Sequence, residues 1–263
     1  MIDTHCHLDD ARYDADRAEV VARAKAAGIT RLVVPGVGPE KWDALVDASR
    51  ADPFIQACAG IHPQLLPELD ASRDGENLEK LDARLVAGGC IAVGECGIDG
   101  PSVALGASME RQIAVFRAHL TLARKHGLPV IAHCLRAHPE LRQVLEEDGV
   151  PEAGLEIHSY SGGPELVKIF GPMGCYFGVA GPVSYAGARK PIATAAAIPS
   201  DRFLLETDAP DQSPTPLRGQ RNEPANLIHV ATALANVRGV PLAELVAQAS
   251  ANARRLFRKL PSD

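Results

Sequence analysis

Eight apolar runs, each short enough to be one buried strand, alternate with helix-like stretches along the chain. Strands that are apolar throughout, rather than at every second residue, are typical of a parallel sheet covered by helices. The pattern predicts strands at residues 2–7, 29–35, 54–61, 90–95, 128–133, 155–158, 175–179 and 203–208. It predicts helices at residues 14–27, 40–51, 76–87, 108–127, 138–148, 164–170, 188–197, 223–237 and 241–258.

Strand and helix in regular alternation, with short connections, predict an α/β protein whose eight units close into a (β/α)8 or TIM barrel. An open, doubly wound sheet is the alternative arrangement of the same units. The 263 residues of the chain match the roughly 250 that one such barrel commonly needs. Since no linker or low-complexity segment interrupts the alternation, we expect a single domain over residues 1–263.

The composition is that of a folded protein, with 46% hydrophobic and 23% charged residues, close to the globular average. Six cysteines lie mostly inside apolar runs, so we interpret them as reduced residues rather than a disulfide framework. Met1 leads directly into the first expected strand without a signal-peptide pattern, and no apolar run approaches the length of a membrane span. We therefore expect a cytoplasmic protein without membrane association.

Residue types that bind metals stand where the expected strands end. Because side chains alternate along a strand, His5 and His7 would project from one face, while Cys6 and Cys134 should point into the layer between barrel and helices. In a barrel of this kind, chemistry takes place at the C-terminal ends of the strands, so the strand-end side chains would face one mouth. The six candidate ligands are His5, His7, Glu95, His133, His158 and Asp208.

Each candidate ligand alone has an ordinary structural explanation, since a strand-end acid can be solvated and a core histidine can be hydrogen-bonded. Six of them at five strand ends favour a metal site instead. Imidazole and carboxylate suit zinc, manganese and related ions. By contrast, His119, His126 and His229 fall on expected outer helices, and we interpret them as structural residues.

Eight short motifs follow one another along essentially the whole chain. They are Ile2-Asp3-Thr4-His5-Cys6-His7-Leu8-Asp9, Gly60-Ile61-His62-Pro63, Val93-Gly94-Glu95-Cys96-Gly97-Ile98-Asp99, His133-Cys134, His158-Ser159-Tyr160-Ser161-Gly162, Leu205-Glu206-Thr207-Asp208-Ala209-Pro210, Arg221-Asn222-Glu223-Pro224, and Asn252 before Leu256-Phe257. In these motifs the chain resembles the TatD family of metal-dependent hydrolases, within the amidohydrolase superfamily. The resemblance implies a barrel hydrolase that holds one or more divalent ions, such as zinc, manganese or magnesium, and several members of the family are deoxyribonucleases.

The resemblance also implies two ion sites that share one carboxylate. The first would use His5, His7, Glu95 and Asp208, and the second Glu95, His133 and His158. Two divalent ions about 3.5–4 Å apart can deprotonate a water and stabilise charge on a phosphoryl oxygen. A carboxylate that reaches both ions lowers their mutual repulsion. We therefore expect catalytic roles for Glu95 as the bridge, for Asp208 as the group that takes the water's proton, and for His62.

Four residues are expected to bind substrate: His62, Arg136, His138 and Arg221. His62 would either donate a hydrogen bond to a phosphate or pack in its loop. Arg136 and His138 follow the fifth strand closely enough to meet a phosphate. Arg221, like Arg218, lies after the last strand, where a solvated surface role is an equal alternative. The chain departs from the family pattern at Leu135, Gly100 and Ser159-Tyr160, which bears on the substrate more than on the metal chemistry.

The leading hypothesis is a metal-dependent hydrolase that cleaves phosphodiester bonds of DNA, above all in single strands or at ends, with a water that the metal activates. The net charge of −6 provides no overall basic field, so binding of DNA would need a local patch or bound cations. The alternatives are hydrolysis of a small-molecule amide or ester, deacylation of aminoacyl-tRNA, and a metal-binding barrel without catalysis. No obligate protein partner is indicated.

Overall fold

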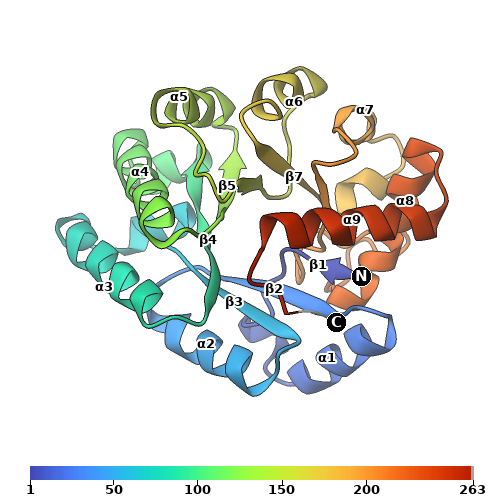
Figure 1. Cartoon of the computed structure of the whole chain (residues 1–263), viewed down its shortest axis with the longest axis horizontal. Helices are drawn as coiled ribbons and strands as arrows, with labels where there is room; N and C mark the ends of the chain where they lie inside the picture. The colour runs from blue at the N-terminus through green and yellow to red at the C-terminus, as the bar shows by residue number, and fades with distance from the viewer. Residues whose placement is uncertain (262–263) are drawn as a thin grey trace.

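The computed structural model describes residues 1–261 as a barrel of parallel strands with helices around its outside (Figure 1). Neighbouring strands follow the order of the chain from β1 to β8. The ring is completed where the backbone N–H of Thr4 donates to Leu205 O at 3.0 Å and where Cys6 forms a parallel bridge with Ala209. The strands are β1 (Ile2–Asp3), β2 (Arg31–Gly36), β3 (Ile55–Ala59), β4 (Cys90–Asp99), β5 (Val130–Leu135), β6 (Leu155–Ile157), β7 (Cys175–Val179) and β8 (Phe203–Leu205). The (β/α)8 barrel is confirmed, and the open sheet is wrong.

The helices lie on the outer surface of the barrel, as predicted. They are α1 (Arg17–Ala26), α2 (Trp42–Ala51), α3 (Asp74–Val86), α4 (Met109–His126), α5 (His138–Asp148), α6 (Pro164–Phe170), α7 (Arg189–Ala197), α8 (Leu227–Arg238) and α9 (Leu242–Leu256). Short 3-10 helices are η1 (Ala11–Tyr13), η2 (Pro39–Lys41), η3 (Pro63–Glu68), η4 (Ala71–Arg73), η5 (Pro101–Leu105), η6 (Gly181–Ser184) and η7 (Pro224–Asn226). Within residues 1–261 no single helix is long and apolar enough to cross a membrane; only the pair Pro224–Arg238 and Leu242–Leu256, bent by 108°, passes on length and composition.

Several expected strands end earlier than the apolar pattern suggested. The strand expected at residues 2–7 is only the two-residue β1, and those expected at 155–158 and 203–208 stop at Ile157 and Leu205. The segments that follow these strands form single backbone hydrogen bonds with neighbouring segments instead of a continuous ladder. One example is the Asp208 N–H, which donates to His5 O at 2.9 Å. The candidate ligands of these segments therefore lie just beyond their strands, at the C-terminal mouth of the barrel.

Two apolar layers hold the barrel together. The larger lies between strands and helices, and Cys6 and Cys134 both lie in it, as predicted. The smaller fills the N-terminal end of the barrel, where Leu256 and Phe257 at the end of α9 pack with Ile2 and other inward-facing residues. Figure 1 shows α9 lying close to β1. All six cysteines are free and buried, as predicted. With the N-terminal end filled, polar chemistry is confined to the C-terminal mouth.

Glu95 lies between two glycines that bring β4 very close to β5. Gly94 and Gly97 have φ of 146° and 137°, a conformation that other residues rarely adopt. A Cβ atom on Gly94 would lie 2.6 Å from Ile131 O, and one on Gly97 would lie 2.1 Å from His133 O. The register between β4 and β5 shifts within this stretch. Glycine is thus required on both sides of Glu95 for the strand to carry this side chain into the mouth.

Candidate metal centre

Histidines and carboxylates from separate strand ends converge at the C-terminal mouth of the barrel. His5 Nε2 and His7 Nε2 lie 3.2 Å apart, and both face Glu95 Oε2, at 3.2 and 3.4 Å. Asp208 Oδ1 completes the group, 3.7 Å from His5 Nε2 and 3.6 Å from His7 Nε2. Four potential ligand atoms from β1, β4 and β8 segments therefore surround one point.

A second group gathers around the other oxygen of Glu95. Its Oε1 lies 2.8 Å from His158 Nε2 and 3.2 Å from His133 Nδ1, and these two nitrogens are 3.2 Å apart. The two oxygens of one carboxylate thus face two different sets of ring nitrogens. The structure brings together all six residues that the sequence marked as candidate ligands; their binding of ions stays a prediction.

The donor atoms fit divalent ions. In a tetrahedral site, ligand atoms are separated by about 1.6 times the metal–ligand distance, which gives roughly 3.3 Å for metal–nitrogen bonds of about 2.0–2.1 Å. The separations measured around Glu95 Oε2 run from 3.2 to 3.7 Å. Glu95 is 1% exposed, and its Oε2 accepts no hydrogen bond from a described residue. Because a buried carboxylate without a compensating partner costs free energy, a cation bound at Oε2 would stabilise this arrangement.

The protonation states also suit a cation. Burial raises the pKa of Glu95, but the neighbouring His62, His158 and His5 outweigh burial and hold this pKa well below its usual range. Burial, with a smaller effect of His158, lowers the pKa of His5 to about 4. Near pH 7 the Glu95 carboxylate is therefore ionised and the His5 ring is neutral, with a lone pair available for an ion.

His62 reaches the centre as a hydrogen-bond donor. Its Nδ1 accepts the backbone N–H of Gln64 at 3.0 Å, so the ring proton is on Nε2, which donates to Glu95 Oε1 at 2.8 Å. The ring lies near enough to Glu95 and His133 to join a metal-binding group, but this tautomer leaves no lone pair on Nε2. His62 therefore positions Glu95 in this structure, and its expected contact with substrate stays a prediction.

Two of the three histidines on the outer helices, His119 and His126, have hydrogen-bonded or ion-pair contacts. His119 of α4 is fully buried; its Nδ1 donates to Val115 O at 2.7 Å, and its Nε2 accepts the backbone N–H of Ile61 at 3.0 Å. It thereby fixes the segment that carries His62. His126 pairs with Asp82 at 2.7 Å, and His229 is half-buried on α8. These positions agree with the structural roles that the sequence predicted.

Asp99 orients His133, a role that the sequence analysis missed. Asp99 Oδ2 lies 2.9 Å from His133 Nε2, while Ser102 donates to Asp99 Oδ1 through its N–H and its hydroxyl at 2.8 and 2.7 Å. Because Nε2–H is donated to Asp99, Nδ1 is the nitrogen of His133 that faces Glu95, as carboxylates commonly orient metal-binding histidines. Burial lowers the pKa of His133, but the hydrogen bonds to Asp99 and Glu95 raise it to about 9. Near pH 7 the metal-free ring therefore holds a proton on both nitrogens, and an ion that binds Nδ1 would displace the proton there. The available signal was the even spacing from Glu95, which puts Asp99 on the same face of β4.

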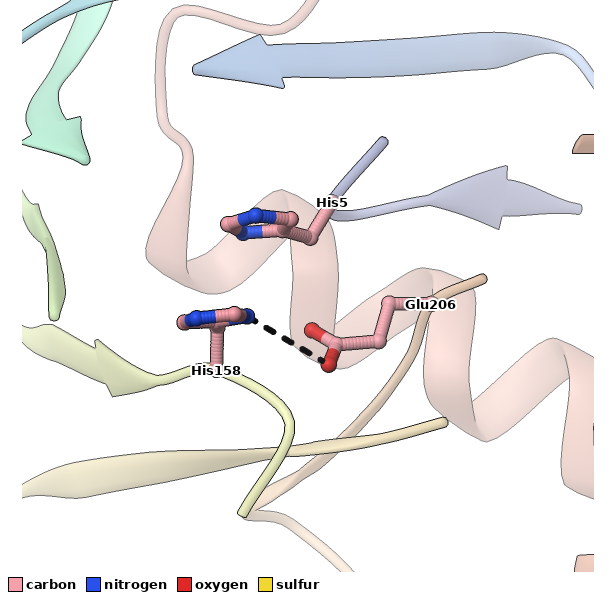
Figure 2. Close-up of side chains that lie close together, drawn as sticks. All are labelled: His5, His158 and Glu206. Atoms are coloured by element: carbon pink, nitrogen blue, oxygen red, sulfur yellow. Dashed lines mark ion pairs between the residues drawn. The ribbon is translucent and has the colours of Figure 1, made fainter. Parts of the chain in front are cut away.

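Glu206 lies on the Nδ1 side of two other candidate ligands and was also missed. The rings of His5 and His158 stack with centroids 3.9 Å apart, and Glu206 Oε1 lies 3.9 Å from His158 Nδ1 (Figure 2). His5 Nδ1, His158 Nδ1 and Glu206 Oε2 have no hydrogen-bond partner among the residues that the structure describes. A Cβ atom on Gly178 would lie 2.2 Å from Glu206 Oε2, so the glycine leaves room for this carboxylate. Glu206 lies two residues before Asp208, and this even spacing, which puts both side chains on one face of an extended segment, was the signal in the sequence.

Two further acids, Asp3 and Glu156, lie fully buried inside the barrel. Thr207 donates to Asp3 through its N–H and its hydroxyl at 3.0 and 2.6 Å, and Thr4 Oγ1 donates to Glu156 at 3.0 Å. Burial raises the pKa of Asp3 to about 7 and that of Glu156 to about 8. Burial and the neighbouring Glu156 also raise the pKa of Glu206. Near neutral pH these acids retain protons, so the interior carries less negative charge than its composition suggests.

Asp208 is held by a polar cluster that the sequence did not predict. Gln212 Nε2 donates to Asp208 Oδ2, and Ser159 Oγ lies 2.9 Å from Gln212 Oε1 and 2.6 Å from Gln212 Nε2. Asp208, Ser159 and Gln212 have φ of 51°, 41° and 50°, in the left-handed region that costs non-glycine residues energy and is concentrated at functional sites. With Oδ2 bonded to Gln212, Asp208 presents Oδ1 to His5 and His7.

Of the other three expected substrate-binding residues, only Arg136 has an exposed charged group without a partner in the described part of the chain. Arg136 is exposed beside the mouth, and its guanidinium has no ion-pair or hydrogen-bond partner within residues 1–261. His138 opens α5 with its ring against Tyr160, and burial lowers its pKa. Arg221 pairs with Asp16 at 2.7 Å and Glu223 at 3.0 Å. Since two carboxylates already bind Arg221, the structure shows it in a structural contact, and its role toward substrate stays a prediction.

Candidate ligands line two cavities, and a third, of about 460 Å³, lies beside Gln212 and Arg218. The larger of the two that the ligands line, of about 360 Å³, has His133, His158 and Asp208 at one end and reaches α7. Leu135 and the Ser159-Tyr160 pair, where the chain departs from the family pattern, also line it. The smaller, of about 260 Å³, lies beside His7 and His62. Gly100, the third departure, has no room for a side chain, because a Cβ there would lie 2.9 Å from Arg136 O.

A parallel barrel whose C-terminal mouth gathers histidines around one central glutamate, with further carboxylates to orient them, defines a barrel-type metal-dependent hydrolase. Comparisons with known proteins specify the family. The family model described as TatD related DNase matches residues 2–258. This chain therefore belongs to the TatD family of metal-dependent hydrolases and is a hydrolase that acts on ester bonds.

Individual relatives span the whole chain. YabD of Bacillus subtilis (strain 168), named as an uncharacterized metal-dependent hydrolase, is 33% identical over 98% of this chain and 99% of its own length. TatD of Erwinia billingiae (strain Eb661), named as a 3'-5' ssDNA/RNA exonuclease, is 34% identical over the same shares of the two chains. The crystal structure of YjjV, a TatD homolog from Escherichia coli K12, is similar with a TM-score of 0.90 and 31% identity over 98% of both chains.

Proposed function

We propose that this hydrolase cleaves phosphodiester bonds of single-stranded DNA from a strand end, with two divalent ions in the barrel mouth. The observation that carries the proposal is Glu95, whose Oε2 faces His5 and His7 while its Oε1 faces His133 and His158. The name of the Erwinia billingiae relative, a 3'-5' ssDNA/RNA exonuclease, supports a nucleic acid as the substrate and the strand end as the point of attack.

The donor atoms divide into two sets. His5, His7, Asp208 and Oε2 of Glu95 would hold one ion, and Oε1 of Glu95, His133 and His158 would hold the other. When bound, such ions supply Lewis acidity that lowers the pKa of water and offsets negative charge on phosphoryl oxygens. A set of neutral imidazoles with carboxylates favours zinc or manganese over magnesium, which prefers oxygen ligands.

The chain's own residues orient the donor atoms and move the proton. Asp208 accepts the proton of the attacking water on a carboxylate oxygen. Gln212 holds Asp208 Oδ2, which fixes the direction of the other oxygen. The Nε2–H of His62 holds Glu95 between the two donor sets. Asp99 fixes the tautomer of His133.

Charge around the mouth favours one side for a phosphate chain. The smaller cavity is acidic, and its two cations, Arg12 and Lys41, already pair with Asp10, Asp211 and Asp9. On the opposite side, Arg136 and Lys190 are exposed and have no acidic partner within residues 1–261. Unpaired cations attract a polyanion, whereas the acidic side repels it. A single strand would therefore approach over Arg136 and Lys190.

The test is nucleotide release from an end-labelled oligonucleotide. Protein stripped with chelator and protein reloaded with zinc, manganese or magnesium are compared on a single strand, on the matching duplex, and on a small ester and a small amide. We expect metal-dependent release of nucleotides from one end of the single strand. If the loaded protein hydrolyses the ester or amide readily but leaves the oligonucleotide intact with every metal, the proposal is wrong. Cytoplasmic location and action without an obligate protein partner also remain predictions.

A further inference from the structure

The cavity of about 360 Å³ opens directly from the candidate metal centre. We define it as the β5–α7 cavity; His133, His158 and Asp208 line its inner end. Its walls are formed by the ends of β5 and β7, the segment after β6 and the inner face of α7. Most of the wall is apolar, and includes Leu135, Tyr160, Val183, Ala195 and Ile198. A substrate whose scissile bond lies at the metal centre would therefore have an adjoining group inside this cavity.

The size of the cavity limits that group to one ring system with its sugar. Ligand sites commonly measure about 300–1,000 Å³, and the β5–α7 cavity, at about 360 Å³, is near the lower end of that range. One nucleoside fits such a volume, but a stack of several does not. The aromatic ring of Tyr160 is half-buried in the wall and packs edge-on against Phe177, 4.8 Å between centroids. Aromatic walls favour flat, polarisable groups.

The edge of the cavity offers an unpaired donor. Lys190 carries an ammonium without an acidic partner in the described part of the chain, and Ser161 carries an exposed hydroxyl, whereas the Thr194 hydroxyl already donates to Gly162 O at 3.0 Å. Asp208, at the metal end, is the only carboxylate among the lining residues. An apolar cavity with donors at its edge selects a ring that carries acceptor atoms and no positive charge. The ring carbonyls and nitrogens of nucleobases meet this description.

We propose that the β5–α7 cavity binds the nucleobase of the nucleotide at the strand end, with Lys190 donating to an acceptor on the edge of the base. This inference rests on the proposed function, because it assumes that the scissile phosphate lies at the metal centre. The cavity thereby receives one group of the substrate, and a single nucleotide at a time lies beside the metal centre. The base then supplies binding energy independently of the phosphate.

The test compares two ligands that differ only in the base. Thymidine 5′-monophosphate and 1,2-dideoxyribose 5-phosphate, which has a hydrogen in place of the base, are titrated into metal-loaded protein by calorimetry, and the ratio of their dissociation constants reports the base alone. We expect the nucleotide to bind roughly tenfold or more tightly, as for one base on an aromatic wall. Ala195→Leu fills the cavity and should bring the ratio close to one. Ala196→Leu, at the exposed neighbouring position on α7, is the matched control and should keep the ratio of the unaltered protein.

A second pair of variants keeps the test decisive if Ala195→Leu does not fold. If Ala195→Leu lowers the melting temperature strongly, Lys190→Met is compared with Lys168→Met, an exposed lysine on α6; only Lys190→Met should reduce the ratio. A ratio near one in the unaltered protein, or a ratio unchanged in Ala195→Leu and Lys190→Met, overturns the cavity assignment, while oligonucleotide cleavage by the same preparation shows that the proposed function stands. A ratio that the cavity variants abolish, in protein that cleaves no oligonucleotide, supports the base site and overturns the proposed function.

Discussion

Replacing Gln212 with leucine should weaken metal binding without unfolding the barrel. Gln212 Nε2 donates to Asp208 Oδ2, and the Asp208 side chain is 12% exposed. This hydrogen bond is present with and without the ion, so its own energy does not enter the affinity for metal. Gln212→Leu instead removes the fixed orientation of Asp208, and immobilising one such side chain costs about 0.5–1.5 kcal/mol. We therefore expect the affinity for the ion next to Asp208 to fall roughly twofold to tenfold, at about 1.4 kcal/mol per factor of ten.

The assay is competition between the protein and a chelator of known affinity, with turnover measured on metal-saturated protein. Gln220→Leu is the matched control, since Gln220 is exposed in the same segment. Ser159→Ala should weaken metal binding less than Gln212→Leu, because Ser159 contacts Gln212 rather than Asp208. If Gln212→Leu and Gln220→Leu bind metal equally tightly and turn over equally fast, the positioning of Asp208 by Gln212 is refuted.

Three further predictions follow from other contacts. Asp208→Asn should fold normally but lower turnover about 10²–10⁴-fold, and near-normal turnover of the metal-saturated variant would exclude Asp208 as proton acceptor. Glu206→Leu should weaken metal binding about 10–100-fold, since it removes the carboxyl group that faces Nδ1 of His158 at 3.9 Å; an unchanged dissociation constant would contradict this role. Burial lowers the pKa of His119 to about 4, from 6.5 in the unfolded chain, so its neutral form contributes stability above pH 6.5 that is lost as the pH falls toward 4. The free energy of unfolding, measured with urea on metal-free protein, should therefore fall between pH 7 and pH 4 by on the order of 3 kcal/mol more in wild type than in His119→Gln. An equal fall in the two proteins would contradict the buried neutral state of His119.

The barrel could be predicted because each strand is a continuous apolar run and each run is followed by a helical pattern. The bounds of the strands could not, because ladder pairing ends where neighbouring segments diverge, which is a property of the assembled ring. β1 keeps only Ile2 and Asp3 for this reason, whereas β4 continues to Asp99 alongside β5. Hydrophobicity marks the buried part of a strand, not the part that pairs.

The candidate ligands could be predicted because strand ends share one mouth in this fold. Asp99 and Glu206 also stand at even spacing from Glu95 and Asp208, so a stricter use of alternation would have found them. Gln212 could not be found this way, since its contact with Asp208 depends on how the loop after β8 folds back.

The ion pairs of Arg221 could not be predicted, because they depend on α1 lying beside the loop after β8, and this tertiary contact leaves no mark in the local sequence. The tautomer of His62 is set locally, since its Nδ1 accepts the backbone N–H of Gln64 where His62 caps the 3-10 helix η3. Its contact with Glu95, on β4, is the tertiary part that the local sequence does not show.

Glu95 would join the two proposed ion sites, and metal content tests this bridging role directly. Wild-type protein, Glu95→Gln and the control Glu110→Gln, an exposed glutamate on α4, are loaded with the same metal, dialysed equally and analysed for metal per chain. Glutamine keeps the size of the side chain but removes the charge that faces both donor sets, so the set built on His133 and His158 should lose its ion first. We predict about two ions per chain in wild type and Glu110→Gln and about one in Glu95→Gln; an equal metal content in all three proteins would contradict the account.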